Sequence, residues 1–173
     1  MSDVYALPPD LPVPEDDGVC DGLVGKTIPS LVLESSQGPV DLAELAAERL
    51  VLYLYPRAGR DERPGWDLIP GARGCTPQAC AFRDHAAELA RLGALVAGVS
   101  AQSLEEQVAF ARRNHMPSPI VSDEDLRLGG ALGLPTFEVD GDMLYKRVPS
   151  SPKAVSSPRS STRSSHRIAT PQT

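Results

Sequence analysis

The sequence predicts an α/β sandwich built on a mixed β-sheet. Two apolar runs without alternation, Leu50–Tyr55 and Ala94–Ser100, are typical of parallel strands that are covered on both faces. Amphipathic stretches follow both runs and give the alternation of strand and helix that marks this fold class. The turn signal Asp140-Gly141 then joins residues 136–139 and 143–148 into a hairpin, so an antiparallel pair is expected beside the parallel strands.

The complete order of expected elements is β-α-β-α-β-α-β-β. Each helix is placed by an apolar stripe or by a capping signal, and each strand by an apolar run between turn residues. The expected strands are residues 28–33, 50–55, 94–100 and 119–121, followed by the hairpin. The expected helices are residues 41–48, with Asp41 as N-cap, and a helix that has Thr76 as N-cap and Pro77 as first residue and ends at Gly93. Two more helices are expected, one from the capping box Ser103/Glu106 to Asn114 and one at 123–132.

Length and composition indicate one globular domain. The 173 residues suffice to bury a core, and 41% apolar with 23% charged residues is ordinary for a soluble protein. No apolar run approaches the roughly 18 residues of a membrane span, and residues 1–17 lack the pattern of a secretory signal. Three cysteines are too few for a disulfide scaffold, which favours a cytoplasmic protein whose thiols do chemistry.

Charge divides the chain into an acidic body and a basic tail. Residues 149–173 hold four of the 17 basic residues and no acids, so residues 1–148 carry a net charge of −10 from 13 basic and 23 acidic residues. An acidic body argues against nucleic acid as the main partner. The tail consists mostly of Ser, Pro, Thr and Arg with little to bury, which predicts disorder.

Cys75 and Cys80 lie at the start of an amphipathic helix. Apolar positions recur at helical spacing through Cys75, Ala79, Phe82, Ala86 and Leu89. Cys80 is about 140° around the helix from Cys75, so Cys75 is expected to point inward and Cys80 toward a flank that solvent reaches. Residues five apart in an intact helix are separated by about 8 Å, beyond the roughly 7 Å that a disulfide spans. A bridge between them therefore requires the first turn to unwind.

The position of Cys75 suits redox chemistry. A thiol must ionise to act as a nucleophile, and a free cysteine has a pKa of about 8.5. The unpaired N–H groups and the dipole of a helix N-terminus favour a thiolate there, and Arg73 is close in sequence. Two buried structural thiols remain the alternative on spacing alone. A metal site is not expected, since no second Cys/His pair has ligand spacing.

The flanks of the cysteines resemble a known family. Tyr55-Pro56 ends a strand and is followed by G-C-T-P-Q-A-C-A-F-R-D, which is similar to peroxiredoxins of the peroxiredoxin Q, or bacterioferritin comigratory protein, type. The longer loop before Cys75 resembles a redoxin-domain subgroup with an insertion. The resemblance covers about residues 22–148 and implies a thioredoxin-like fold.

The resemblance also implies a function and its residues. Cys75 corresponds to the peroxidatic cysteine, Cys80 to the resolving one, Pro56 to the proline that shields the nucleophile and Arg147 to the arginine that polarises the peroxide. The implied activity is reduction of hydrogen peroxide and organic hydroperoxides through a sulfenic acid and a Cys75–Cys80 disulfide, recycled by thioredoxin or a similar dithiol. No cofactor, nucleic acid or membrane is implied, and the protein would be a monomer or homodimer.

Two departures from the family pattern stand out. Ala72 occupies the position of a Thr or Ser whose hydroxyl binds peroxide, so a loop N–H or Arg73 would have to substitute. After Arg147 the family adds a strand and a helix that are missing here, as a truncation or frameshift would produce. We therefore expect an irregular arm at 1–21, a peroxiredoxin domain at 22–148 and a disordered tail at 149–173. The alternatives are a disulfide reductase or redox sensor without peroxidase activity, and a non-catalytic remnant.

Overall fold

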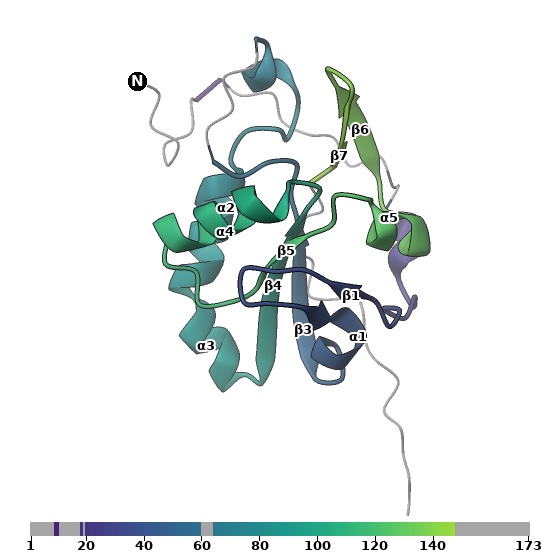
Figure 1. Cartoon of the computed structure of the whole chain (residues 1–173), viewed down its shortest axis with the longest axis vertical. Coiled ribbons are helices and arrows are strands. Elements are labelled where there is room, and N and C mark those ends of the chain that lie inside the picture. The colour runs from purple at the N-terminus through teal and green to yellow at the C-terminus, as the bar shows by residue number, and fades with distance from the viewer. Residues whose placement is uncertain (1–8, 11–17, 19, 60–63, 148–173) are drawn as a thin grey trace, which may run out of the picture.

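Three parallel strands form the central sheet of the computed structural model, which describes residues 9–10, 18, 20–59 and 64–147. β3 (Arg49–Leu54) pairs in parallel with β4 (Ala94–Ser100) over the whole length of β3. β5 (Ile120–Ser122) pairs with the other edge of β4, which gives the order β3-β4-β5 seen in Figure 1. The two apolar runs of the sequence are therefore parallel strands, as predicted.

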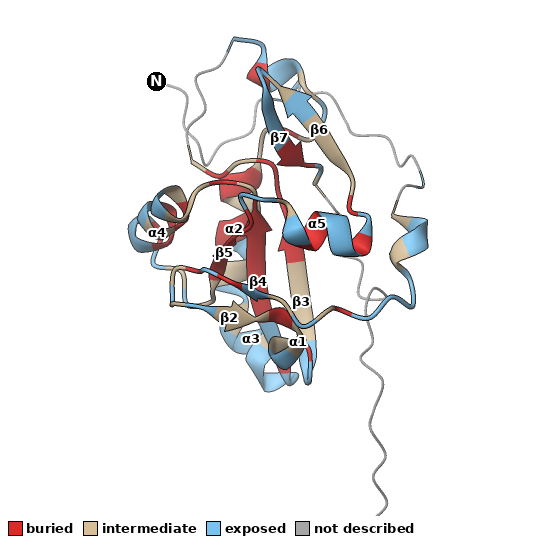
Figure 2. Cartoon of the chain, turned by 45° about the vertical axis from the view of Figure 1, so that its right-hand side comes forward, coloured by how far each residue is buried: buried red, intermediate tan, exposed pale blue. Residues whose placement is uncertain are grey.

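Helices cover both faces of this sheet. α2 (Cys75–Asp84), α3 (Ala86–Arg91) and α4 (Leu104–Arg113) lie on one face, and α1 (Leu42–Leu45) and α5 (Arg127–Leu132) lie on the other. Figure 2 shows the buried central strands between these layers. The core accordingly has two main clusters, one that includes Leu42, Leu54, Val99, Val121 and Leu128, and one that includes Tyr53, Tyr55, Cys75, Ala79 and Phe110. The predicted α/β class is confirmed.

Antiparallel pairs flank the parallel strands. β1 (Val32–Leu33) pairs with β2 (Val40–Asp41), and β6 (Thr136–Val139) pairs with β7 (Asp142–Tyr145). Parallel and antiparallel strands therefore both occur, but each antiparallel pair forms its own two-stranded ladder rather than joining one mixed sheet. A single antiparallel bridge, Ser35 to Val121, links the turn after β1 to β5. Two short 3-10 helices, η1 (Asp21–Leu23) and η2 (Trp66–Leu68), complete the described elements.

Two capping signals in the sequence are confirmed. The Asp41 carboxylate accepts hydrogen bonds from the N–H groups of Ala43 and Glu44 and starts α1. Ser103 and Glu106 form the complete capping box at the start of α4, with each side chain bonded to the other's backbone N–H. Local side-chain chemistry therefore fixes where these helices begin.

Several predicted boundaries are wrong. The first strand covers only Val32–Leu33, and α1 ends at Leu45 rather than near residue 48. The helix from Cys75 is broken at His85, whose φ and ψ of −100° and 5° leave the helical range, so α3 is separate. α5 begins at Arg127 rather than at 123, because the Asp123 carboxylate accepts from the backbone N–H groups of Arg127 and Leu128 and stays outside the helix.

The predicted division of the chain remains a prediction. The tail at 149–173, the strand and helix expected to be missing there, and most of the arm at 1–21 lie outside the described residues. In the described part of the chain, no helix combines the length and apolar character needed to cross a membrane.

One buried polar contact anchors the β6–β7 hairpin. Tyr145, at the end of β7, is fully buried, and its hydroxyl donates to Asp123 Oδ2 at 2.5 Å. The same hydroxyl oxygen accepts from the N–H of Gly129 at 2.8 Å. A Cβ at residue 129 would lie 2.8 Å from that oxygen, so only glycine allows this approach. The phenol thereby ties β7 to the start of α5.

Replacing Tyr145 tests this anchor. Tyr145→Phe removes the hydroxyl from a buried carboxylate and a buried N–H, so we expect the free energy of unfolding to fall by about 1–3 kcal/mol. Urea denaturation measures the change. Tyr53→Phe is the matched control, because Tyr53 is equally buried and no hydrogen bond of its hydroxyl is found among the described residues. An equal loss in both variants would contradict the role given to the Tyr145 hydroxyl.

Candidate functional site

Cys75 is the first residue of α2 and is 2% exposed. The sequence placed the N-cap at Thr76, but the structure places it at Gly74, so the cysteine itself is in the first turn. Gly74 has a φ of 100°, a conformation that favours glycine and lets the loop turn sharply into the helix. The sulfur therefore lies beside the free N–H groups of a helix N-terminus, on the face that packs against Tyr55 and Ala79.

Arg147 reaches the sulfur from the other end of the described chain. Its Nη2 lies 3.2 Å from Cys75 Sγ and 2.9 Å from the carbonyl oxygen of Arg73. Its Nε donates to the carbonyl of Gly71 at 3.2 Å, and its Nη1 contacts Gly74 O at 3.4 Å and Gln78 Oε1. The guanidinium is thus held by backbone carbonyls of the loop that precedes Cys75, with one edge on the sulfur.

Two opposing influences act on the Cys75 thiol. Burial is the larger and raises the pKa of Cys75 above its ordinary value. The Arg147 guanidinium and the backbone N–H groups of Arg57 and Cys75 lower the pKa and so offset part of this effect. With the thiol protonated, the S–H donates to the carbonyl of Ala72 at 3.4 Å. The donors that a thiolate needs are in place, but burial outweighs them in this conformation.

Pro56 brings one of these donors to the site. It is fully buried two residues after the end of β3, and its carbonyl accepts from the Ser100 hydroxyl at 3.0 Å. The next residue, Arg57, is the one whose N–H reaches the Cys75 sulfur. Two residues further on, the Gly59 N–H donates to Thr76 Oγ1 at 3.0 Å, which ties the segment to α2. The structure thus brings together three of the predicted site residues, Pro56, Cys75 and Arg147.

Cys80 is buried, and the prediction that it faces a solvent-accessible flank is wrong. It is 8% exposed, and its Sγ contacts Asn114 Oδ1 at 3.7 Å. Asn114 ends α4 and also accepts from Arg83 Nη1 through its backbone carbonyl, so the end of α4 covers this side of α2. The angle around the helix correctly predicts that Cys80 lies on a different side of α2 from Cys75. It does not predict that the end of α4 packs on that side. Cys75, Cys80 and Cys20 form no disulfide.

Ala72 fills its position by packing rather than by hydrogen bonding. It is 1% exposed and belongs to a small cluster with Trp66 and Leu144 of β7. Trp66 therefore packs against this loop and β7. Arg73, one of the donors expected to replace the missing hydroxyl, pairs its guanidinium with Asp67 at 2.8 Å. The loop N–H that reaches the sulfur belongs to Arg57.

Several residues of the site were missed in the sequence. Gln78, which contacts Arg147, lies one helical turn after Cys75, so helical spacing was a usable signal. Asn114 ended a predicted helix, but nothing in the sequence placed that end on Cys80. The carbonyls of Gly71 and Arg73 belong to the backbone, so no residue type in the sequence marks them as partners of Arg147. In the described part of the chain, no group of three or more His, Cys, Asp or Glu residues could hold a metal.

Known proteins share both the sequence and the fold of this region. Residues 68–148 match the AhpC/TSA family. The chloroplastic peroxiredoxin Q of Sedum lineare is 36% identical over 113 residues, which are 65% of this chain and 54% of that protein. Peroxiredoxin Bcp of Bacillus subtilis is 32% identical over 109 residues, which are 62% of each chain. The chain thus spans about half to three fifths of the length of these curated relatives.

A solved structure gives the same result. The crystal structure of peroxidoxin BcpB from Mycobacterium tuberculosis is 29% identical, with a TM-score of 0.57 over 72% of this chain and 74% of that one. The resemblance to peroxiredoxin Q and Bcp proteins and the thioredoxin-like fold predicted from the sequence are therefore confirmed.

The raised pKa of Cys75 predicts a distinct pH profile. At neutral pH only a small fraction of the thiol is ionised, so the rate of alkylation should rise about tenfold per pH unit and continue to rise beyond about pH 8.5. Iodoacetamide labelling of Cys75 in a Cys20→Ser/Cys80→Ser variant measures this profile. Arg147→Met removes the cation and should displace the profile to still higher pH. A rate that is already constant below neutral pH would show that the donors outweigh burial.

Proposed function

We propose that this chain is a thiol-dependent peroxidase of the peroxiredoxin Q and Bcp kind, because residues 68–148 match the AhpC/TSA family and the chain resembles these proteins. Its substrates are hydrogen peroxide and organic hydroperoxides. The observation that carries the proposal is the contact of 3.2 Å between Arg147 Nη2 and the Cys75 sulfur at the start of α2. This pair offers a nucleophile and a cation within reach of one bound peroxide.

The first step oxidises Cys75. The thiolate attacks one peroxide oxygen, so an S–O bond forms and the O–O bond breaks. The departing oxygen takes a proton and leaves as water or an alcohol, and Cys75 becomes a sulfenic acid. Arg147 and the N–H of Arg57 stabilise the thiolate before the attack, and Arg147 also stabilises the charge that develops on the departing oxygen.

The second step uses Cys80. Its thiolate attacks the Cys75 sulfur, a disulfide forms and the sulfenic oxygen leaves as water. Both cysteines belong to α2, and residues five apart in a helix are about 8 Å apart, so the first turn must unwind before they can bond. An external dithiol, for which thioredoxin is the proposed reductant, then exchanges with the disulfide and restores both thiols.

The cellular setting belongs to the same proposal. We infer a cytoplasmic protein, because three cysteines are too few for a disulfide scaffold. The proposed chemistry needs only thiols, and we propose that the protein works as a monomer or homodimer. The plant relatives carry names that mark them as chloroplastic.

A redox sensor or disulfide reductase is the second candidate. Ala72 contributes no hydroxyl to the site, and burial raises the pKa of Cys75. Both features lower the rate at which a peroxide would be attacked. They leave the exchange between a disulfide and the two cysteines possible once the helix opens.

Peroxide turnover decides between these candidates. We expect the wild type to oxidise thioredoxin in the presence of hydrogen peroxide or an organic hydroperoxide, and Cys75→Ser to have no turnover because the nucleophile is gone. Consumption of NADPH through thioredoxin reductase measures the rate. Cys80→Ser should lose turnover and accumulate a sulfenic acid that dimedone traps.

Each other outcome points to a different function. Disulfide exchange without peroxide turnover supports the sensor, and the lack of a cooperative unfolding transition supports a non-catalytic remnant. Turnover in Cys80→Ser at the wild-type rate with thioredoxin would exclude Cys80 as the resolving residue.

The contact between Cys80 and Asn114 should limit the second step. Unwinding of α2 must separate Cys80 Sγ from Asn114 Oδ1 and Arg83 from the Asn114 carbonyl. Asn114→Ala removes the first contact, so we expect the disulfide to form several-fold faster after Cys75 is oxidised, a change of about 1 kcal/mol. Rapid-quench mass spectrometry measures that rate. The rate of sulfenic acid formation serves as the internal control, and a slower disulfide step would contradict the expectation.

A further inference from the structure

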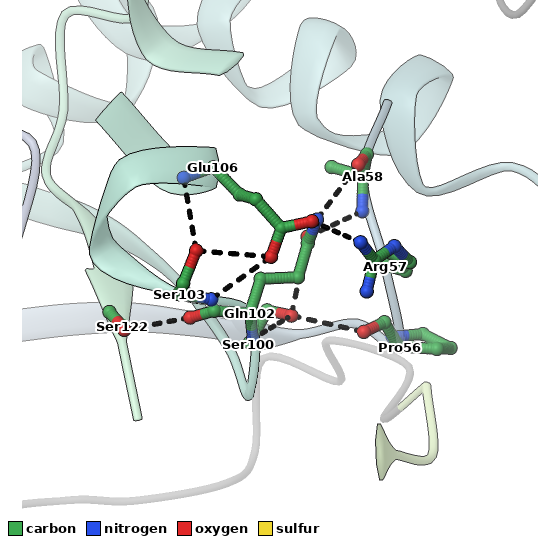
Figure 3. A network of polar contacts seen from close by, with 8 residues as sticks. All are labelled: Pro56, Arg57, Ala58, Ser100, Gln102, Ser103, Glu106 and Ser122. Atoms are coloured by element: carbon green, nitrogen blue, oxygen red, sulfur yellow. Dashed lines mark hydrogen bonds and ion pairs between the residues drawn. The ribbon is translucent and has the colours of Figure 1, made fainter. Parts of the chain in front are cut away.

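The backbone segment after β3 is held in place from a different part of the chain. Ala58 is 5% exposed, and both of its backbone groups pair with one side chain, that of Gln102. The Ala58 N–H donates to Gln102 Oε1 at 2.8 Å, and Gln102 Nε2 donates to the Ala58 carbonyl at 3.1 Å. Figure 3 shows this amide inserted beside the segment Pro56–Ala58. The side chain therefore replaces the hydrogen bonds that a neighbouring strand would supply.

Gln102 is itself fixed within the turn between β4 and α4. It is 4% exposed, its N–H donates to Ser100 Oγ at 3.2 Å, and its carbonyl accepts from Ser122 Oγ at 2.7 Å. Ser100 Oγ also donates to the carbonyl of Pro56 at 3.0 Å. The turn thus holds the two residues on either side of Arg57, one through Ser100 and one through Gln102.

Arg57 is tied to the same turn by its side chain. Its guanidinium forms an ion pair with Glu106, and that carboxylate is also bonded to the N–H and hydroxyl of Ser103 in the capping box of α4. The backbone of Arg57 faces the site instead, since its N–H donates to the Cys75 sulfur. The contacts of Pro56 with Ser100, of Ala58 with Gln102 and of the Arg57 side chain with Glu106 therefore fix the direction of the Arg57 N–H.

We propose that Gln102 is a positioning residue for Cys75, because its amide holds the Ala58 backbone so that the Arg57 N–H stays on the Cys75 sulfur. The residue does not touch the sulfur itself. This inference rests on the proposed function, in which the Cys75 thiolate is the nucleophile. It adds to that function a group 27 positions along the chain that tunes the nucleophile through the backbone.

The test uses an isosteric variant. Gln102→Met keeps the length of the side chain and removes both of its hydrogen bonds to Ala58, so the segment loses its fixed position. In a Cys20→Ser/Cys80→Ser background we expect the pKa of Cys75 to rise by about one unit and alkylation by iodoacetamide near neutral pH to be about 10-fold slower. The pH profile of alkylation measures both quantities.

A second buried glutamine provides the matched control. Gln107 is fully buried and also uses its amide twice, as acceptor from the Tyr55 hydroxyl and as donor to the Val121 carbonyl. Gln107→Met loses the same number of hydrogen bonds but leaves those of residues 56–58 intact, so its Cys75 profile should shift less than that of Gln102→Met. An unchanged profile in Gln102→Met, or an equal shift in both variants, would overturn the proposal.

Two further measurements keep the test decisive. If Gln102→Met does not fold, Ser100→Ala removes the hydroxyl that donates to the Pro56 carbonyl and accepts from the Gln102 N–H, and it should give a shift in the same direction. An unchanged profile in Ser100→Ala then overturns the proposal. Alkylation needs no peroxide, so a failure of peroxide turnover in the wild type would reject the proposed function without deciding the role of Gln102.

Discussion

The contact between Arg147 and Cys75 is the constraint on which the rest of this structure depends. A sulfur that is almost fully buried can ionise only if donors offset the loss of water, and the strongest donor comes from a residue 72 positions away. The Tyr145–Asp123 contact fixes the strand that leads to Arg147. The contact between Arg147 and Cys75 therefore depends on two elements that are far apart in sequence.

The loop before Cys75 serves the arginine as much as the cysteine. Its carbonyls at Gly71, Arg73 and Gly74 accept from the Arg147 guanidinium and limit its rotation. The apolar contacts of Ala72 with Trp66 and Leu144 hold those carbonyls in position. Ala72 has no hydroxyl to donate to the site. The loop instead holds the Arg147 guanidinium through its backbone carbonyls.

Features of the fold and site that depend on residues close in sequence could be predicted. β3 and β4 were predictable because apolar runs without alternation need cover on both faces, and the capping box at Ser103 because its partners are three residues apart. The burial of Cys80 and the partner of Arg73 were not, because each depends on which side chain folds against it. Gln102 was missed because a side chain that pairs with a backbone 44 positions away leaves no pattern in either stretch.

Trp66 is the only tryptophan in the chain. It is 5% exposed and packs with Ala72, three residues before Cys75. Its indole therefore lies in the loop whose carbonyls bind Arg147. If Trp66 moves away from Ala72 and Leu144, the polarity around the indole ring changes. Intrinsic fluorescence thus gives an optical signal from within the loop, without a label, that distinguishes a loop packed on β7 from one that has moved away. Because Trp66 is buried in the cluster with Ala72 and Leu144, its emission indicates the state of this loop.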